Sequence, residues 1–562
     1  MSFAHNEKGA IAPSWAIAND DDINTLKDYF VQYYFQCVLT SDMAELEENF
    51  ERLLLKSCNA KKYIDFQQYI IKLCLQNRDI KRGKGLTQTT YMMLNILTYY
   101  SYEKEMFPRN TILKILKGFV TNKFDEDTKQ YEHPYGSWKD IKNFLDYFWK
   151  SQRYDYVNVT KISIEDDIIQ KLYIPQMISD RKNMSIRRSI SLCGKWLPRE
   201  SGQFKELAKR IATQYHNKVF QVSATKVKIY QNYRKLISKY NQYLDTTQIH
   251  MTGNSWDRIK FENVTSKTLF LNKESFLNRK NIHQEHRDIC RQNFQQYLAI
   301  KENNGNYLKN NNTVMPHALV RDAVRMFHHE NESISLLNMQ WNGLMKTLEQ
   351  NNFMKDNYCF PCIDVSPSMM VDNATPLHCA IGLGLACAHL CKHNRAFTFS
   401  SHPEWIQYDP TEHFVDRVYK TRNSGWGSTT NIHKLFKKIL NTCLIRNQDN
   451  LGVPQSEIDN TCLIIFSDMQ FDCHETRSEG DLFEVIRREY KDAGYDNIPF
   501  LIFWNLRTTN TFPTIEKSKN MIQMSGNSTS LLEIFMKTRL DDLKKLENWD
   551  ILTQILDKYI LS

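Results

Sequence analysis

The sequence contains no apolar run that approaches the ~18 residues of a membrane span. Its first residues also lack the basic-then-apolar pattern of a secretion signal. The 13 cysteines are scattered without the spacing of a disulfide framework, which is typical of reduced thiols inside a cell. We therefore expect a protein that makes no membrane contact and lies in the cytoplasm.

Several catalytic signatures are also missing. No Gly-rich loop ends in GK[ST], which argues against an ATPase. Gly382 and Gly384 do not follow a strand, so they indicate close packing of a helix on a sheet rather than a dinucleotide site. Cys359 and Cys362 have no second pair at ligand spacing and fall in an apolar run, which favours core packing over zinc or redox chemistry.

The basic charge is concentrated in the middle of the chain, although the overall net charge is only +9. Residues 1–50 carry 2 Lys and Arg against 9 Asp and Glu, and residues 301–562 carry 27 against 31. Residues 51–300 carry 44 against 24, a net charge of +20. Such a block indicates either a surface for a polyanion or a solvated lysine-rich face, and charge alone does not separate the two.

The first part of the chain has helical periodicity. At 562 residues the chain is too long for a single core, so it needs several domains or a repeat array joined to a domain. Up to about residue 350, apolar residues such as Met43, Leu46 and Phe50 recur on one helical face. We expect an N-terminal segment over 1–25 and stacked helical repeats over 26–350.

Two helix starts in this part are marked by capping residues. Asn110 stands at the N-cap position shortly after Pro108, and Ser137 is followed three residues later by Asp140, which is a capping pattern. We therefore predict helices that begin just after Asn110 and Ser137.

The second part, over 355–540, alternates short β-branched and aromatic runs with helical stretches. Near-continuous apolar strands separated by helices predict a doubly wound α/β domain with a parallel sheet covered on both faces. We expect one or two amphipathic helices over 541–562. The predicted strands are "YCFPCIDV", "RAFTFSS", "NTCLIIFSD" and "NIPFLIFWNL".

Side chains with oxygen atoms lie at three predicted junctions between a strand and the following helix. Ligands of open α/β sheets bind at the carboxyl ends of the strands, and oxygen donors are what a hard cation such as Mg²⁺ prefers. The sequence thus predicts a site for Mg²⁺ or another divalent cation. Its candidate ligands are Asp364, Ser366, Ser368, Thr430 and Asp468, with Thr429 as the alternative to Thr430.

This pattern resembles the metal-ion-dependent adhesion site of von Willebrand factor A domains, in which Asp-x-Ser-x-Ser, a Thr after a glycine turn and Ser-Asp follow in order. The resemblance implies that Asp364, Ser366 and Ser368 form the first motif and Asp468 the last. Where the family has Gly-Gly-Thr this chain has Gly-Ser-Thr-Thr, so the second element is Thr429 or Thr430.

Basic phrases upstream of this domain include "NRDIKRGKG", "DRKNMSIRRSI", "CGKWLPRE" and "YRKLISKYNQYLD". With the domain order they resemble the TROVE module of Ro ribonucleoproteins and, more closely, an uncharacterised family of plants, fungi and large DNA viruses. That resemblance implies a ring or horseshoe of HEAT-like repeats that binds small structured RNA. The implied RNA-binding residues are Arg78, Lys81, Arg82, Lys84, Lys182, Arg187, Arg188, Lys195, Arg234 and Lys235.

Neighbouring aromatic residues are candidates for stacking on unpaired bases. They are Trp138, Trp196, Tyr233 and Trp256, and core packing is the favoured interpretation for the first two.

Three functions remain open at this point. The first is a non-enzymatic RNA-binding protein, located in the host cytoplasm or virion if it is viral. The second is a protein-interaction scaffold whose metal captures an acidic side chain of a partner; whichever function holds, we expect a monomer. The third and least favoured is a metal-dependent nuclease, because the carboxylate cluster for two metals is missing.

Overall fold

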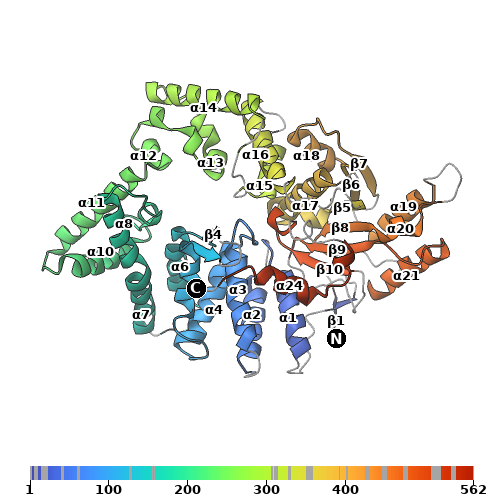
Figure 1. The fold of residues 1–562 in the computed structure, drawn as a ribbon, viewed down its shortest axis with the longest axis horizontal. Coiled ribbons are helices and arrows are strands. Elements are labelled where there is room, and N and C mark those ends of the chain that lie inside the picture. The colour runs from blue at the N-terminus through green and yellow to red at the C-terminus, as the bar shows by residue number, and fades with distance from the viewer. Residues whose placement is uncertain are drawn as a thin grey trace.

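In a computed structural model the chain forms a curved array of helices joined to an α/β domain (Figure 1). The residues described are 3–5, 11–13, 23–39, 43–59, 64–125, 130–154, 156, 158–305, 308, 314–326, 331–349, 358–391, 393–399, 403–424, 431–445, 452–471, 479–507, 521–532 and 540–560.

The helical part contains paired helices with two small hairpins, β1–β2 (Phe3–His5, Ile11–Pro13) and β3–β4 (Lys123–Asp125, Gln130–Glu132). Its helices are α1 (Ile23–Gln36), α2 (Met43–Asn59), α3 (Ile64–Arg78), α4 (Thr87–Tyr102), α5 (Thr111–Val120), α6 (Trp138–Lys150), α7 (Asn158–Ile168), α8 (Ile174–Ser185), α9 (Cys193–Trp196), α10 (Lys205–Phe220), α11 (Lys226–Tyr243), α12 (Thr247–Thr252), α13 (Ser266–Phe276), α14 (Glu285–Asn303), α15 (Pro316–Met326) and α16 (Asn331–Glu349). A π-helical turn, η1 (Ile169–Tyr173), joins α7 to α8, and 3-10 turns η2 (Trp256–Arg258) and η3 (Phe261–Asn263) precede α13.

The helices pack as the apolar periodicity predicts. Leu46, Phe50 and Leu53 of α2 are fully buried, and α2 packs against α1, α3 and α4. Because each helix has one apolar face, it is stable only when its neighbours cover that face, which produces an array rather than separate helices. In Figure 1 the array curves from α1 through α6, α8 and α11 to α14.

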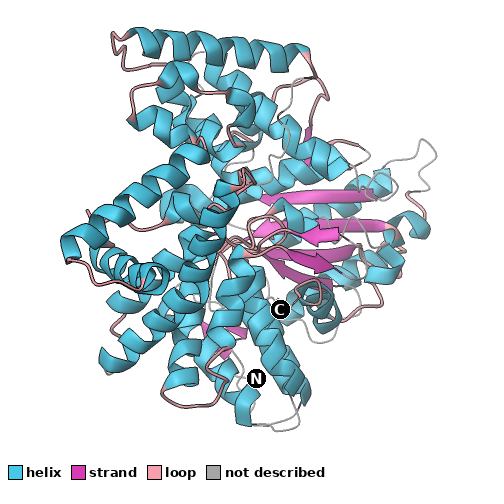
Figure 2. Cartoon of the chain, turned by 60° about the vertical axis from the view of Figure 1, so that its left-hand side comes forward, coloured by secondary structure: helices cyan, strands magenta, loops and turns pink. Residues whose placement is uncertain are grey.

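The α/β domain contains one six-stranded sheet in the order β10-β9-β8-β5-β6-β7. Its strands are β5 (Tyr358–Asp364), β6 (Arg395–Phe399), β7 (Glu404–Gln407), β8 (Thr461–Ser467), β9 (Phe500–Asn505) and β10 (Met521–Ser525). Its principal helices are α17 (Val371–Leu390), α18 (Phe414–Arg422), α19 (Ile432–Ile445), α20 (Gln455–Asp459) and α21 (Glu479–Asp492). Figure 2 shows helices on both sides of the sheet.

The strand order confirms a doubly wound domain and corrects one expectation. Five strands are parallel, but β7 is an antiparallel edge strand paired with β6, so the sheet is mixed. Strand β7 was not predicted from the sequence because only Ile406 of its residues is buried, so it contains no continuous apolar run. All residues of β8 and β9 are buried, which explains why these strands were predictable. Gly382 and Gly384, for which the sequence indicated close helix–sheet packing, lie in α17. A Cβ on Gly384 would come within 2.4 Å of Ile363 Cγ1 of β5.

The α/β domain contacts both ends of the helical array, so the chain closes on itself. At one end α15 and α16 pack on α17 and α18. At the other, α1 packs on β10, and the C-terminal helix α24 (Asn548–Leu556), preceded by α23 (Leu540–Leu543), packs on α1 and α3. Asn505 donates a hydrogen bond to Phe35 O, and Tyr559 donates one to Asp79 Oδ2. None of the described helices has the length and apolarity needed to cross a membrane.

Candidate functional site

The candidate metal ligands lie where two central strands end. Asp364 is the last residue of β5, Ser366 and Ser368 follow it, and Asp468 comes directly after β8. The two strands are neighbours in the sheet, so their carboxyl ends bring the two loops together. Asp364, Ser366 and Asp468 are fully buried, whereas Ser368 is half-buried.

Hydrogen bonds orient the Asp364 carboxylate. Its Oδ1 accepts from the backbone N–H of Ser366 at 2.9 Å, and its Oδ2 accepts from Ser467 Oγ at 2.5 Å. Ser366 Oγ lies 3.0 Å from Ser368 Oγ. The sequence argument overlooked Ser467, although the "SD" pair at the end of β8 contains it.

The two carboxylates at this edge influence one another. Burial, together with the negative charge of Asp468, raises the pKa of Asp364 to about 7. Asp468 Oδ1 accepts from the backbone N–H of Gln470 at 3.2 Å, and its Oδ2 lies 3.6 Å from Nη1 of Arg507. Repulsion between buried carboxylates is a cost that a bound cation removes.

Backbone near the candidate metal ligands lies in the left-handed region at two places, the kinked start of α17 and the residue after Asp468. Asp372, Asn373 and Ala374 have φ of 50°, 59° and 60°, and Met469, next to Asp468, has φ of 62°. Such conformations cost about 1–2 kcal/mol per non-glycine residue and accumulate at binding sites.

The available donors fit a hard, oxygen-preferring cation. Asp364, Asp468 and the hydroxyls of Ser366 and Ser368 supply only oxygen, which is the chemistry of a magnesium site that keeps waters. No group of three or more His, Cys, Asp or Glu that could hold a metal occurs within the described ranges, so the four donors do not form a zinc or two-metal cluster there. Thr429 and Thr430 lie outside the described residues, and their predicted role stays a prediction.

The structure contradicts the RNA-binding role predicted for Lys84. Its side chain is buried, and Nζ donates to Tyr34 O, to Cys37 O at 2.9 Å and to Ser525 Oγ at 2.7 Å. Lys84 therefore joins the end of α1 to β10 and is inaccessible to a ligand. The lysine-rich phrase gave no sign of this, because the partners of Lys84 are distant in sequence.

Arg78 is also unsuited to binding RNA, because Asp140 already occupies its guanidinium. Nε and Nη2 of Arg78 donate to the two carboxylate oxygens of Asp140 at 2.6 and 2.7 Å, and the arginine side chain is 12% exposed. Ser137 Oγ donates to Asp140 Oδ2 at 2.7 Å instead of capping α6. The helices begin where the capping residues predicted, but neither Asn110 nor Ser137 forms a side-chain cap.

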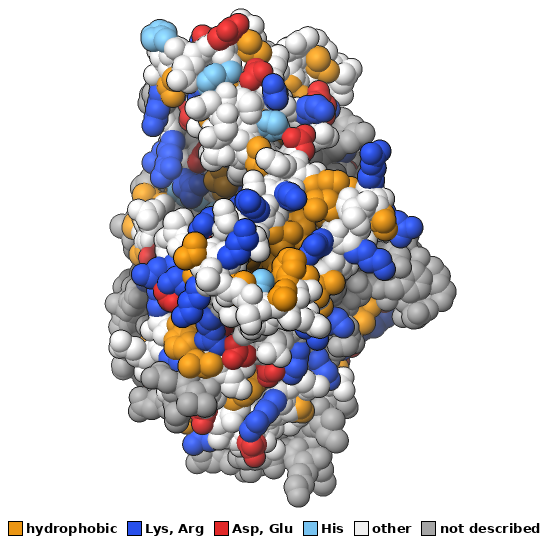
Figure 3. Space-filling view, turned by 90° about the vertical axis from the view of Figure 1, so that its left-hand side faces the viewer, with side chains coloured by type: hydrophobic (Ala, Val, Ile, Leu, Met, Phe, Trp, Pro, Cys, Tyr) orange, Lys and Arg blue, Asp and Glu red, His pale blue; other side chains and the backbone are white. Residues whose placement is uncertain are grey.

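The other predicted RNA-binding residues remain on the surface. Arg234 forms an ion pair with Glu200, and Lys195 is half-buried. The fully exposed members of the predicted set are Lys81, Arg82, Lys182, Arg187, Arg188, Arg234 and Lys235. Figure 3, which faces α7–α11, shows basic side chains around an apolar area in the middle of this face.

A cluster of cations around Trp196 was only partly anticipated. We call Lys139, Lys142, Lys195 and Trp196 the Trp196 cluster: the three Nζ atoms lie 5.5, 5.4 and 5.4 Å from the centre of the indole. Among the described residues none of these ammonium groups has a carboxylate within ion-pairing distance. Burial, and then the charges of Lys139 and Arg199, lower the pKa of Lys142.

The aromatic candidates separate clearly by burial. Trp138, Tyr233 and Trp256 are buried in the core, as core packing predicted for Trp138, while Trp196 is only half-buried. The basic segment "CGKWLPRE" contains Lys195 and Trp196, whereas Lys139 and Lys142 come from α6, and the distance in sequence between these segments concealed that they meet.

The chain thus combines an array of helices with a doubly wound α/β domain, and its parts match two families without assigned function. Residues 166–354 match the model described as Domain of unknown function (DUF2828), and residues 358–554 match Domain of unknown function (DUF7788). The boundary between the two matches coincides with the boundary between the helical part and β5.

Similar proteins include one from a large DNA virus. The "Uncharacterized protein L728" of Acanthamoeba polyphaga mimivirus is 25% identical over 560 residues, which cover 97% of this chain and 87% of that protein. Among solved structures, the RO (RSR) protein of Deinococcus radiodurans aligns over 98% of this chain and 96% of its own, with 11% identity and a TM-score of 0.35. A score at that level is too low to support an argument about function.

Proposed function

We propose that this protein binds small structured RNA without acting as an enzyme, with the helical array as the binding surface. The Trp196 cluster is the observation that supports this proposal. Its three ammonium groups all lie within 5.5 Å of the centre of one indole and have no carboxylate partners among the described residues, so a polyanion that binds there meets concentrated positive charge. The half-buried indole adds an aromatic surface of the kind that RNA-binding proteins use.

The test is RNA affinity as a function of salt. A structured RNA with a free 3′ end is titrated against the intact protein at several salt concentrations, with duplex DNA as the comparison. The variant Lys139→Gln/Lys142→Gln/Lys195→Gln removes the three charges of the cluster. Each lost contact to single-stranded RNA should flatten the slope of log K against log salt by about 0.7, giving a decrease of about 2.

A matched control removes three lysines that already have partners. Lys150, Lys171 and Lys209 form surface ion pairs with Asp146, Asp167 and Glu206 at 2.7, 3.0 and 2.9 Å. Changing these three to Gln alters the net charge equally and should leave the salt slope nearly intact. Equal loss in both triple variants, or equal affinity for RNA and DNA, would show that the basic charge is only a solvated face.

We also propose that the edge formed by Asp364, Ser366, Ser368 and Asp468 binds Mg²⁺. A cation there would offset the repulsion between the two buried carboxylates, so Mg²⁺ at about a hundred times its Kd should stabilise the fold by about 2.7 kcal/mol. Ser366→Ala should weaken this stabilisation in thermal unfolding, whereas Asp372→Asn, an exposed carboxylate in the same loop, should not. Mg²⁺ stabilisation that is the same in both variants would contradict the site.

A second candidate function uses the metal instead of the basic surface. Four oxygen donors leave coordination positions open on Mg²⁺, and a carboxylate from a partner protein could fill one of them. Loss of partner capture in Asp364→Ala, with RNA affinity unchanged, would favour this interaction scaffold.

A further inference from the structure

Nitrogen-bearing side chains from four helices gather where the helical array meets the α/β domain. Both α15 and α18 pack on α17, and α15 also packs on α18 (Figure 1). The residues are Lys267 of α13, His317, Arg321 and Arg325 of α15, His378 of α17 and Arg422 of α18.

Close packing brings the two histidines near one another. A Cβ on Gly382 would lie 2.7 Å from Pro316 Cβ, so the start of α15 touches α17 one turn after His378. His317 is the next residue after Pro316, and Arg321 lies one turn further along the same face of α15.

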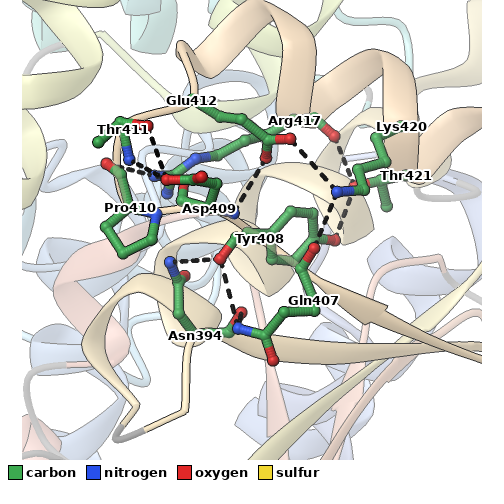
Figure 4. A network of polar contacts seen from close by, with 10 residues as sticks. All are labelled: Asn394, Gln407, Tyr408, Asp409, Pro410, Thr411, Glu412, Arg417, Lys420 and Thr421. Atoms are coloured by element: carbon green, nitrogen blue, oxygen red, sulfur yellow. Dashed lines mark hydrogen bonds and ion pairs between the residues drawn. The ribbon is translucent and has the colours of Figure 1, made fainter.

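A polar network fixes the turn before α18 to that helix (Figure 4). Asp409 Oδ1 accepts from the N–H and Oγ1 of Thr411 at 2.8 and 2.7 Å, and Arg417 Nη2 donates to Asp409 O at 2.8 Å. The Tyr408 hydroxyl lies 2.8 Å from Oγ1 of Thr421. These bonds fix the turn and the helix together and thereby place Arg422, the residue after Thr421.

The junction contains donors without acceptors. His317 Nδ1 is buried and has no hydrogen-bond partner among the described residues, and the same holds for Arg321 Nε, which lies 3.5 Å from Asp322 Oδ1. Asp322 is itself bonded to Lys273 at 2.5 Å. A buried polar atom without a partner costs about 1–3 kcal/mol, and the guanidinium of Arg321, whose side chain is 40% exposed, connects the junction to solvent.

Burial, aided by neighbouring positive charges, keeps both imidazoles neutral at pH 7. Burial lowers the pKa of His317 to about 4, helped by Arg321, His378 and Lys267. Burial also lowers the pKa of His378 to about 4, helped by three arginines of which Arg321 is the first. The junction therefore combines several positively charged side chains with imidazole groups that each retain an N–H donor.

We propose that Lys267, His317, Arg321 and His378 form a binding site for a phosphate monoester. Phosphate has three terminal oxygens and up to two negative charges, which matches a guanidinium fork, an ammonium group and two imidazole donors better than a single carboxylate does. The site lies on different helices from the Trp196 cluster and does not depend on it.

The phosphate has two possible sources, a free small molecule or the end of an RNA. Burial and then the charges of Arg78 and Lys139 lower the pKa of Lys267, against the opposing charge of Asp140, so Lys267 of the junction lies near Lys139 of the Trp196 cluster. An RNA held on the array could therefore reach the junction with a terminal phosphate.

The experiment has two arms on the full chain. In the first, inorganic phosphate is titrated by calorimetry. In the second, a short RNA with a 5′-phosphate is compared with the same RNA carrying a 5′-hydroxyl. Arg321→Gln and Lys267→Gln, on separate helices, should each weaken phosphate-dependent binding about tenfold, because each removes a charge-assisted hydrogen bond. Arg291→Gln, an exposed arginine of α14, is the matched control and should bind as the unaltered chain does.

Each outcome bears on the site itself. A preference for the 5′-phosphate that both junction variants lose and the control retains supports the site and assigns it to an RNA end. Binding of inorganic phosphate alone, with the same dependence on the variants, supports the site for a small phosphate and stands even if RNA binding fails. Absence of phosphate binding in both arms, or equal weakening by the control, overturns the proposal.

Discussion

Replacing Lys84 with methionine should weaken the contact between the helical array and the α/β domain. The ammonium group donates to Tyr34 O, Cys37 O and Ser525 Oγ, and it lies 3.6 Å from the centre of the Tyr34 ring. Methionine has similar length and no donor, so the substitution removes these interactions without leaving a large cavity.

The expected loss of unfolding free energy depends on which hydrogen-bond acceptors lose their donor in Lys84→Met. Tyr34 O still accepts from Ser525 Oγ at 2.8 Å, but Cys37 O loses the Lys84 donor. An unsatisfied buried carbonyl costs about 1–3 kcal/mol, and a desolvated cation–π contact contributes about 2 kcal/mol. The variant no longer buries an ammonium group, which offsets part of this loss. We therefore expect destabilisation by about 2–3 kcal/mol.

The pH dependence gives a second, independent signature. Burial lowers the pKa of Lys84 to about 7, whereas the unfolded chain has the ordinary value of about 10.4. Between these values the unfolded state binds more protons, so the free energy of unfolding rises with pH, by about 2 kcal/mol from pH 7 to 9. This increment should be missing in Lys84→Met, so the difference between the two proteins grows with pH.

Urea unfolding at pH 7 and 9, with hydrogen exchange of α1 and β10, measures both effects. Lys81→Met, an exposed lysine three residues away, is the control and should change stability by less than about 0.5 kcal/mol. The reasoning is refuted if Lys84→Met unfolds at the same urea concentration as the control, with unchanged exchange in α1 and β10.

Two further changes test the packing around the candidate sites. Asp140→Asn leaves Arg78 without its carboxylate and should cost about 3 kcal/mol in urea unfolding. Although burial raises the pKa of Asp140, the charge of Arg78 and the hydrogen bonds from Arg78, Ser137 and Tyr91 together hold it below its ordinary value, so this contribution is present above about pH 4 and disappears as the pH falls further. A loss no larger than that of Asp146→Asn on the same helix would contradict it. Gly384→Ala should lower thermal stability by about 1–3 kcal/mol because the new Cβ would meet Ile363, and it should cost less in an Ile363→Ala background, where that contact is missing; an unchanged melting temperature in the single variant would show that α17 does not approach β5 so closely.

Local patterns in the sequence were sufficient to predict the two-part fold and the proximity of Asp364 and Asp468. Helical periodicity around Phe50 and the apolar run of β8 report burial directly, because helices and strands impose fixed spacings on the side chains they bury. The carboxyl ends of parallel strands lie at one edge of a sheet, so Asp364 and Asp468 could be placed near each other without a structure.

The fate of the charged residues was decided only by the tertiary structure. Lys84 looked like part of a basic surface, yet it bonds to Ser525, 441 residues away, inside the closed chain. Asp140 looked like a capping residue and instead neutralises Arg78 of another helix. The Trp196 cluster likewise forms only when separate segments pack together. A charged side chain has no periodicity of its own: its burial, its partner and its pKa depend on which distant residues the fold brings within a few ångströms.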